Sequence, residues 1–93
     1  MFFNDVFIKG KYMQLKLIGS NQTEITFLDE TQIFFSYEQA VCVRNEDGCF
    51  VTTEKYSRTT SKHINRWVAG LSNIIKMVPQ SEIDNLVNGV SNE

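Results

Sequence analysis

The segment Gln32-Ile33-Phe34-Phe35-Ser36-Tyr37 decides how this chain folds. Side chains alternate between the two faces of a β-strand, so Ile33, Phe35 and Tyr37 share one face. Phe34 lies on the opposite face. A strand with large apolar residues on both faces is typical of a position that is covered on both sides. We therefore expect this segment to lie at the centre of a β-sheet.

Period-two patterns of apolar and polar residues surround the central segment. Turn residues at 19–22 and 29–31 separate the runs, and every connection is short. Short connections join antiparallel neighbours, which predicts a meander of four or five strands. The predicted strands span residues 12–18, 23–28, 32–37, 40–44 and 49–55.

The hydrophobic period changes in the last third of the chain. Ile64, Trp67 and Val68 fall at positions i, i+3 and i+4, which predicts an amphipathic helix. Thr60 or Ser61 is expected to cap the start of this helix.

Two further elements follow that helix. Residues 74–78 are apolar and β-branched, which predicts one more strand that Pro79 ends. Ser81 is expected to cap a second helix that ends near Gly89.

These elements predict an α+β fold: a small antiparallel β-sheet of about four to six strands with one or two helices packed on one face. Ninety-three residues, 42% of them hydrophobic, form about one core. We expect a single domain over residues 13–93. Met13 is an alternative start, so residues 1–12 are expected to be an N-terminal arm or an extra strand.

The two cysteines flank a turn signal. Cys42 and Cys49 lie on either side of Asn45-Glu46-Asp47-Gly48, so both are expected on one β-hairpin. A three-residue loop would pair Cys42 with Thr52, and a two-residue loop would pair it with Thr53. Neither register places the two sulfur atoms opposite each other, which predicts two buried or half-buried free thiols.

Nothing in the sequence predicts a membrane location. The apolar start is interrupted by Asp5 and lacks the basic region and the cleavage site of a signal peptide. No run approaches the ~20 apolar residues that a transmembrane helix needs. We therefore expect a cytoplasmic protein that does not bind membranes.

The inventory of catalytic groups is sparse. His63 is the only histidine, and its helix position predicts partial exposure without a nearby carboxylate to orient it. Two cysteines and one histidine fall short of the ligands of a closed zinc site, and no Gly-rich phosphate loop is present. We expect no metal, no cofactor and no enzymatic activity.

The segment 55–67 differs from the rest of the chain in charge. The remaining sequence holds five basic and eleven acidic groups, so a chain of net charge −2 contains one basic island. The basic residues of this island are Lys55, Arg58, Lys62 and Arg66, and no acidic residue lies among them.

The placement of these cations does not favour the helix. Lys62 and Arg66 point together to its outer side, where like charges four residues apart cost about 0.2–0.5 kcal/mol. Lys62 also lies in the first turn, where the helix dipole disfavours a cation by about 0.3–1 kcal/mol. Local rules that are broken without visible compensation tend to mark functional sites.

Hydroxyl groups precede the helix beside these cations. Free backbone N–H groups, small hydroxyls and cations at a helix start form a site for an anion such as phosphate. The alternative interpretation is that the same residues are helix caps, a loop and a solvated helix face. The candidate residues for binding an anion or nucleic acid are Lys55, Ser57, Arg58, Thr59, Thr60, Lys62 and Arg66.

The run Lys55-Tyr56-Ser57-Arg58-Thr59-Thr60-Ser61-Lys62-His63-Ile64-Asn65-Arg66-Trp67 resembles a segment of small bacteriophage and prophage proteins. The resemblance extends to residues 17–21 and 78–80, and it covers most of the chain apart from the first dozen residues. The function of those proteins is unknown. The resemblance therefore implies only a setting, that of a phage accessory protein inside a host bacterial cell.

Three functions stay open at this point. The leading hypothesis is a non-enzymatic protein that binds an anionic partner, nucleic acid, through the basic helix surface. The alternatives are a protein–protein inhibitor or adaptor of a host defence or replication enzyme, and a self-assembling structural protein such as a homodimer.

Overall fold

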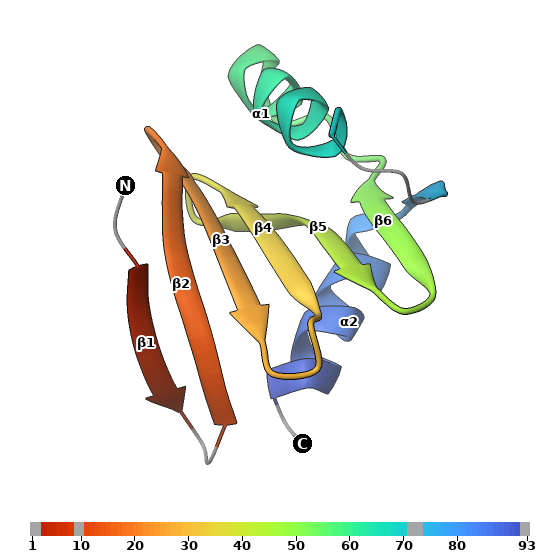
Figure 1. Cartoon of the computed structure of the whole chain (residues 1–93). Coiled ribbons are helices and arrows are strands. Elements are labelled where there is room, and N and C mark those ends of the chain that lie inside the picture. Colours follow the sequence, from red (N-terminus) through yellow and green to blue (C-terminus); the bar gives the residue numbers. More distant parts are fainter. Residues whose placement is uncertain (1–2, 9–10, 71–73, 92–93) are drawn as a thin grey trace.

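A computed structural model describes residues 3–8, 11–70 and 74–91 of the chain (Figure 1). Within these residues the fold is α+β, as the sequence predicts, and it contains one seven-stranded sheet and two helices. The elements are β1 (Phe3–Ile8), β2 (Lys11–Gly19), β3 (Gln22–Phe27), β4 (Gln32–Ser36), β5 (Gln39–Asn45), β6 (Gly48–Thr52), α1 (Arg58–Val68), β7 (Ile75–Val78) and α2 (Gln80–Ser91).

The sheet follows the order of the chain. Strands β1 to β6 form an antiparallel meander, and β7 pairs with β6 in parallel. The predicted antiparallel sheet of about four to six strands therefore corresponds to β1–β6, and the parallel strand β7 adds a seventh that makes the sheet mixed. Parallel neighbours need a long crossover connection, and α1 supplies it between β6 and β7.

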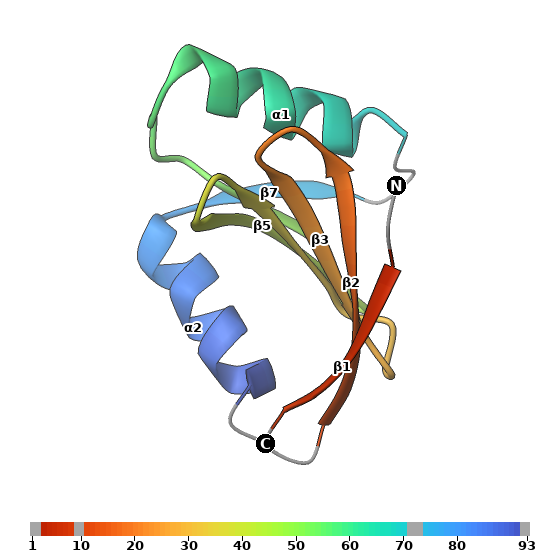
Figure 2. The ribbon, with the colours of Figure 1, turned by 90° about the vertical axis from the view of Figure 1, so that its left-hand side faces the viewer.

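The two helices lie on opposite faces of the sheet (Figure 2). On β4, Phe34 packs in the cluster that includes Trp67 of α1, whereas Ile33 packs in the cluster that includes Ile83 of α2. The sequence predicted one or two helices on one face, whereas the structure has one helix on each face. The expectation of a strand covered on both sides is confirmed for Gln32–Ser36. Tyr37 was predicted in this strand on the face of Ile33, but it lies in the following turn and contacts His63 of α1.

Each face of the sheet carries its own apolar core. The core under α2 consists of the buried residues Met13, Phe27, Ile33, Ala40, Val43 and Ile83. The core under α1 consists of the buried residues Phe34, Val41, Cys42, Cys49 and Val51. The sheet is thus the middle layer between α1 and α2.

Trp67 fixes α1 onto the sheet. Its ring stacks on Phe34 with 5.2 Å between centroids and 12° between planes. Its indole N–H donates a hydrogen bond of 2.8 Å to Oε2 of Glu24 on β3. The same side chain therefore has apolar contact with β4 and polar contact with β3, which defines where the helix sits.

The β5–β6 hairpin has a register that the sequence did not predict. Asn45 pairs with Gly48 across a two-residue loop, and Cys42 consequently pairs with Val51 rather than with Thr52 or Thr53. Gly48 has φ of +132°, where side chains are strained. The predicted free thiols are confirmed, because Cys42 and Cys49 are both buried and unbridged.

The Phe34→Ala substitution should lower the free energy of unfolding by about 3–5 kcal/mol, because it empties the centre of the core under α1. Urea unfolding followed by far-UV circular dichroism measures this change. The control Leu28→Ala removes a side chain that is 78% exposed and should change stability by no more than about 0.5 kcal/mol. Equal effects of the two substitutions would contradict the assignment of Phe34 to the core.

Candidate functional site

Helix α1 begins where Ser57 caps it. Ser57 has an extended backbone (φ −159°, ψ 166°), and its Oγ accepts a hydrogen bond of 3.0 Å from the N–H of Thr60. The predicted caps, Thr60 and Ser61, are instead inside the first turn. The helix therefore starts one turn earlier than the apolar spacing indicated, and Arg58 belongs to it.

The outer side of α1 carries a stripe of exposed cations. Arg58, Lys62 and Arg66 fall at i, i+4 and i+8, so they follow one side of the helix over about 12 Å. Lys55 is exposed immediately before the helix. Within the described part of the chain, none of these four side chains forms an ion pair or a hydrogen bond. We call Arg58, Lys62 and Arg66 the cationic stripe.

The predicted hydroxyl residues separate into two groups. Thr59 is exposed beside the cationic stripe, whereas Thr60 is buried and only 5% exposed. Thr60 Oγ1 accepts hydrogen bonds from Ser36 Oγ (3.1 Å) and from Ser57 Oγ (3.2 Å). The hydroxyls of Ser57 and Thr60 therefore serve the capping and docking of α1. Lys55, Arg58, Thr59, Lys62 and Arg66 remain at the surface.

His63 is buried, which corrects the prediction of partial exposure. Its side chain is 8% exposed, and its Nδ1 lies 2.8 Å from Ser36 Oγ. Thr60, His63 and Trp67 share the inner side of α1 at the spacing i, i+3 and i+7. The sequence contains this spacing, but the apolar stripe of Ile64, Trp67 and Val68 places His63 on its flank and so predicts partial exposure.

The Ser36–His63 contact has the form of a nucleophile next to a base. Ser36 is only 1% exposed, however, and it lies in the core beneath α1, where its single O–H donates to Thr60 Oγ1. A substrate cannot approach a hydroxyl in that position. We interpret Ser36, Thr60 and His63 as a buried polar network that holds α1 against the end of β4.

Tyr37 lies next to this network in an unusual backbone conformation. It follows β4 in the turn to β5 and has φ of 58°, a region that bulky side chains rarely occupy. Its N–H donates a hydrogen bond of 2.7 Å to the carbonyl of Asn21 in the β2–β3 turn. Its ring is tilted by 36° against His63 at 5.9 Å between centroids, and half of the side chain is exposed. No pattern in the sequence indicated this arrangement.

One of the comparisons with known proteins identifies a family. Residues 13–85 match the family of unknown function DUF8033. The chain belongs to this family. No curated protein and no solved structure matches it. The matched span of the DUF8033 domain starts in β2 and includes the whole of α1, the buried polar network and Tyr37.

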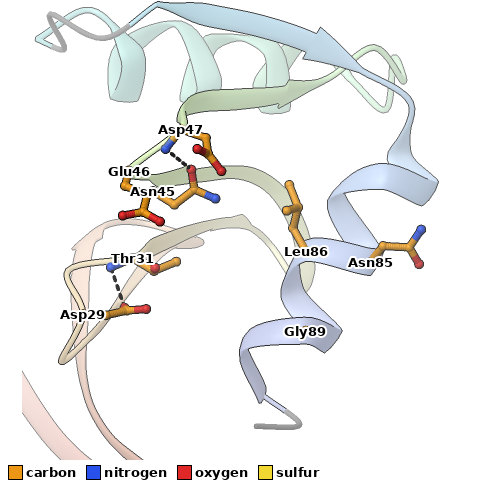
Figure 3. A pocket seen from close by; sticks show the side chains of 8 residues that line it. All are labelled: Asp29, Thr31, Asn45, Glu46, Asp47, Asn85, Leu86 and Gly89. Atoms are coloured by element: carbon orange, nitrogen blue, oxygen red, sulfur yellow. Dashed lines mark hydrogen bonds between the residues drawn. The ribbon is translucent and has the colours of Figure 1, made fainter.

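Acidic side chains lie at the end of the DUF8033 sheet opposite to the turn that contains Tyr37. A cavity of about 450 Å³ lies between the β3–β4 loop, the β5–β6 loop and α2 (Figure 3). Asp29 and Asn45 use their side-chain oxygens to accept from the N–H groups of Thr31 (2.9 Å) and Asp47 (2.8 Å). No group of three or more His, Cys, Asp or Glu side chains suited to a metal ion occurs among the described residues.

The free edge of β7 exposes apolar side chains. Ile74, Ile75 and Met77 are 78%, 43% and 57% exposed. Ile75 and Met77 line one side of a groove of about 270 Å³, and Ile64 and Val68 of α1 line the other. Neither helix in the described part of the chain has the length and apolarity needed to cross a membrane.

Burial controls the chemistry of the two thiols. It raises the pKa of Cys42, and the neighbouring Cys49 raises it further. Burial also raises the pKa of Cys49, although nearby Arg44 opposes part of that rise. Both residues are therefore poor nucleophiles and poor metal ligands in the folded state, because each of these reactions needs the thiolate.

The Ser36→Ala substitution should lower the free energy of unfolding by about 1–3 kcal/mol, because it leaves the buried polar atoms of His63 and Thr60 with fewer partners. The double change Ser36→Ala/Thr60→Val should cost less than the sum of the single changes, because the two hydroxyls share one network. Urea unfolding checks both values. Thr59→Val, which changes an exposed threonine, is the matched control. If the losses of unfolding free energy from the single changes at Ser36 and Thr60 add up to the loss in the double variant, the network is contradicted.

Alkaline pH should destabilise the domain through its thiols. Below the ordinary thiol pKa of 9.0 the two thiols are protonated in both the folded and the unfolded chain, so they do not make the free energy of unfolding depend on pH. Above it the unfolded chain ionises first, and stability should fall by up to about 1.4 kcal/mol per pH unit for each protected thiol. Urea unfolding across this pH range should show a shallower fall for Cys42→Ala/Cys49→Ala. Identical slopes for both proteins would count against thiol burial as the cause.

Proposed function

We propose that this DUF8033 chain is a small binding protein that holds nucleic acid on the outer surface of α1. The observation that carries the proposal is the cationic stripe. It consists of three exposed positive charges on one side of a helix whose other side is committed to the core. The resemblance to phage proteins suggests that this binding serves a phage accessory protein in a bacterial cell, and that setting belongs to the same proposal.

The electrostatic arrangement supports this choice of partner. Like charges four residues apart disfavour the helix, and its first turn carries the cation Arg58 without an acidic residue to offset it. Lys62 lies in the second turn, which corrects the prediction that it occupies the first. A polyanion that contacts the stripe would remove this repulsion and release its own counterions. The chain as a whole has a net charge of −2, so attraction to a polyanion depends on a local cluster of cations rather than on the overall charge.

A protein partner is the second candidate, and the β7 edge favours it. Exposed apolar side chains on an edge strand are typical of a surface that binds another chain. The same edge has features that discourage strand addition, because it has only four residues, contains Lys76 and is followed by Pro79. No feature of this kind weighs against the cationic stripe, so we rank nucleic acid ahead of a protein partner.

The Lys62→Gln/Arg66→Gln variant should bind nucleic acid more weakly and with a smaller dependence on salt. Each lost phosphate contact lowers the slope of log K against log salt by about 0.7–0.9, so the double change should lower it by about 1.4–1.8. Fluorescence anisotropy with labelled DNA and RNA over a series of salt concentrations measures the slope.

The matched control is Lys76→Gln, which removes an exposed cation on β7, away from the stripe. It should leave the slope close to that of the wild type. Absence of binding by the wild type at micromolar concentration and low salt would overturn the proposal. A slope that falls as much in the control as in the single variant Lys62→Gln would show general charge attraction rather than a site on α1.

A further inference from the structure

Tyr37 occupies a backbone conformation that does not suit its side chain. Its φ of 58° is found mainly for Gly, Asn and Asp, and for other residues such conformations cost of order 1–3 kcal/mol. Asn21 has the same φ in the neighbouring β2–β3 turn, where an Asn is well suited to it. The turn at Tyr37 therefore does not need a tyrosine, and a smaller residue would form it at lower cost.

The surroundings hold the ring of Tyr37 at the surface. The hydrogen bond from its N–H to the Asn21 carbonyl ties the two turns together at 2.7 Å. His63, which Ser36 anchors at 2.8 Å, lies against the ring, while half of the side chain stays exposed. The result is an aromatic ring that is fixed in position and still open to solvent.

This ring lies beside the cationic stripe. His63 contacts Tyr37, and its helix neighbours one turn away on either side are Thr59 and Arg66, both exposed. Tyr56 adds a second aromatic side chain, 44% exposed, immediately before the helix. Cations that follow a phosphate backbone and exposed rings that accept bases are the two parts of a surface for single-stranded nucleic acid.

We propose that the ligand of this surface is single-stranded nucleic acid and that Tyr37 stacks against one of its bases. This inference rests on the proposed function, because the cationic stripe must bind the phosphates. A duplex keeps the faces of its bases stacked inside, so an exposed ring adds affinity only to a strand whose bases are free. The carboxylate of Glu38, next in the chain, repels phosphate and leaves stacking as the favourable contact at this turn.

The test measures anisotropy of a labelled oligothymidylate and of a labelled DNA duplex of the same length with four proteins. The wild type should prefer the single strand. Tyr37→Phe keeps the ring and should bind as the wild type does. Tyr37→Leu should bind the single strand about 5- to 160-fold more weakly, with unchanged duplex affinity and an unchanged salt slope.

The fourth protein is Tyr37→Asn, which separates binding from folding. Asn suits the positive φ, so this variant should unfold at a higher urea concentration than Tyr37→Leu. It should nevertheless bind the oligothymidylate as weakly as Tyr37→Leu does. If Tyr37 served only to form the turn, Tyr37→Asn would be more stable than Tyr37→Leu and would bind the oligothymidylate as strongly as the wild type does.

The outcomes distinguish this inference from the proposed function. Full single-strand affinity in Tyr37→Leu, or equal affinity of the wild type for the duplex, overturns stacking by Tyr37. In either case, weaker binding by the Lys62→Gln/Arg66→Gln variant would still support the proposal that α1 binds nucleic acid. Absence of wild-type binding to both probes overturns the two proposals together.

Discussion

The burial of β4 on both faces is the constraint on which the rest of the structure depends. Ile33 and Phe34 are adjacent in the chain and nearly inaccessible, so the sheet must be covered from both sides. One helix cannot do this. The chain therefore places α1 over Phe34 as the connection between β6 and β7, and then returns α2 to the face of Ile33.

Polar contacts decide how α1 sits on its face of the sheet. An apolar helix stripe over an apolar strand can slide or rotate with little cost, whereas hydrogen bonds between buried groups allow few positions. Glu24 receives the indole N–H of Trp67 near one end of the helix, and Ser36 contacts Thr60 and His63 near the other. Both attachments use residues on the inner side of α1, so the side chains on its outer side are not needed to hold the helix against the sheet.

Local periodicity was enough to predict the strands from β2 to β7 and the existence of both helices, whereas β1 was expected only as an alternative to an N-terminal arm. Phe34 alone indicated that the central strand is covered twice. The parallel pairing of β7 was not accessible in this way, because it depends on where the crossover helix lands rather than on the residues of the strand. The inward position of His63 and the strain at Tyr37 were missed for a related reason: each is imposed by neighbours that are distant in the sequence.

The crossover position of α1 has a consequence for the order of folding. Strands β2 to β6 pair only with their sequence neighbours, so each hairpin closes a short loop at a small entropic cost. The pairing of β7 with β6 closes a longer loop that contains the whole of α1, at a larger entropic cost. We therefore expect the surface that carries Arg58, Lys62 and Arg66, which lies on this crossover, to form after the hairpins of the meander.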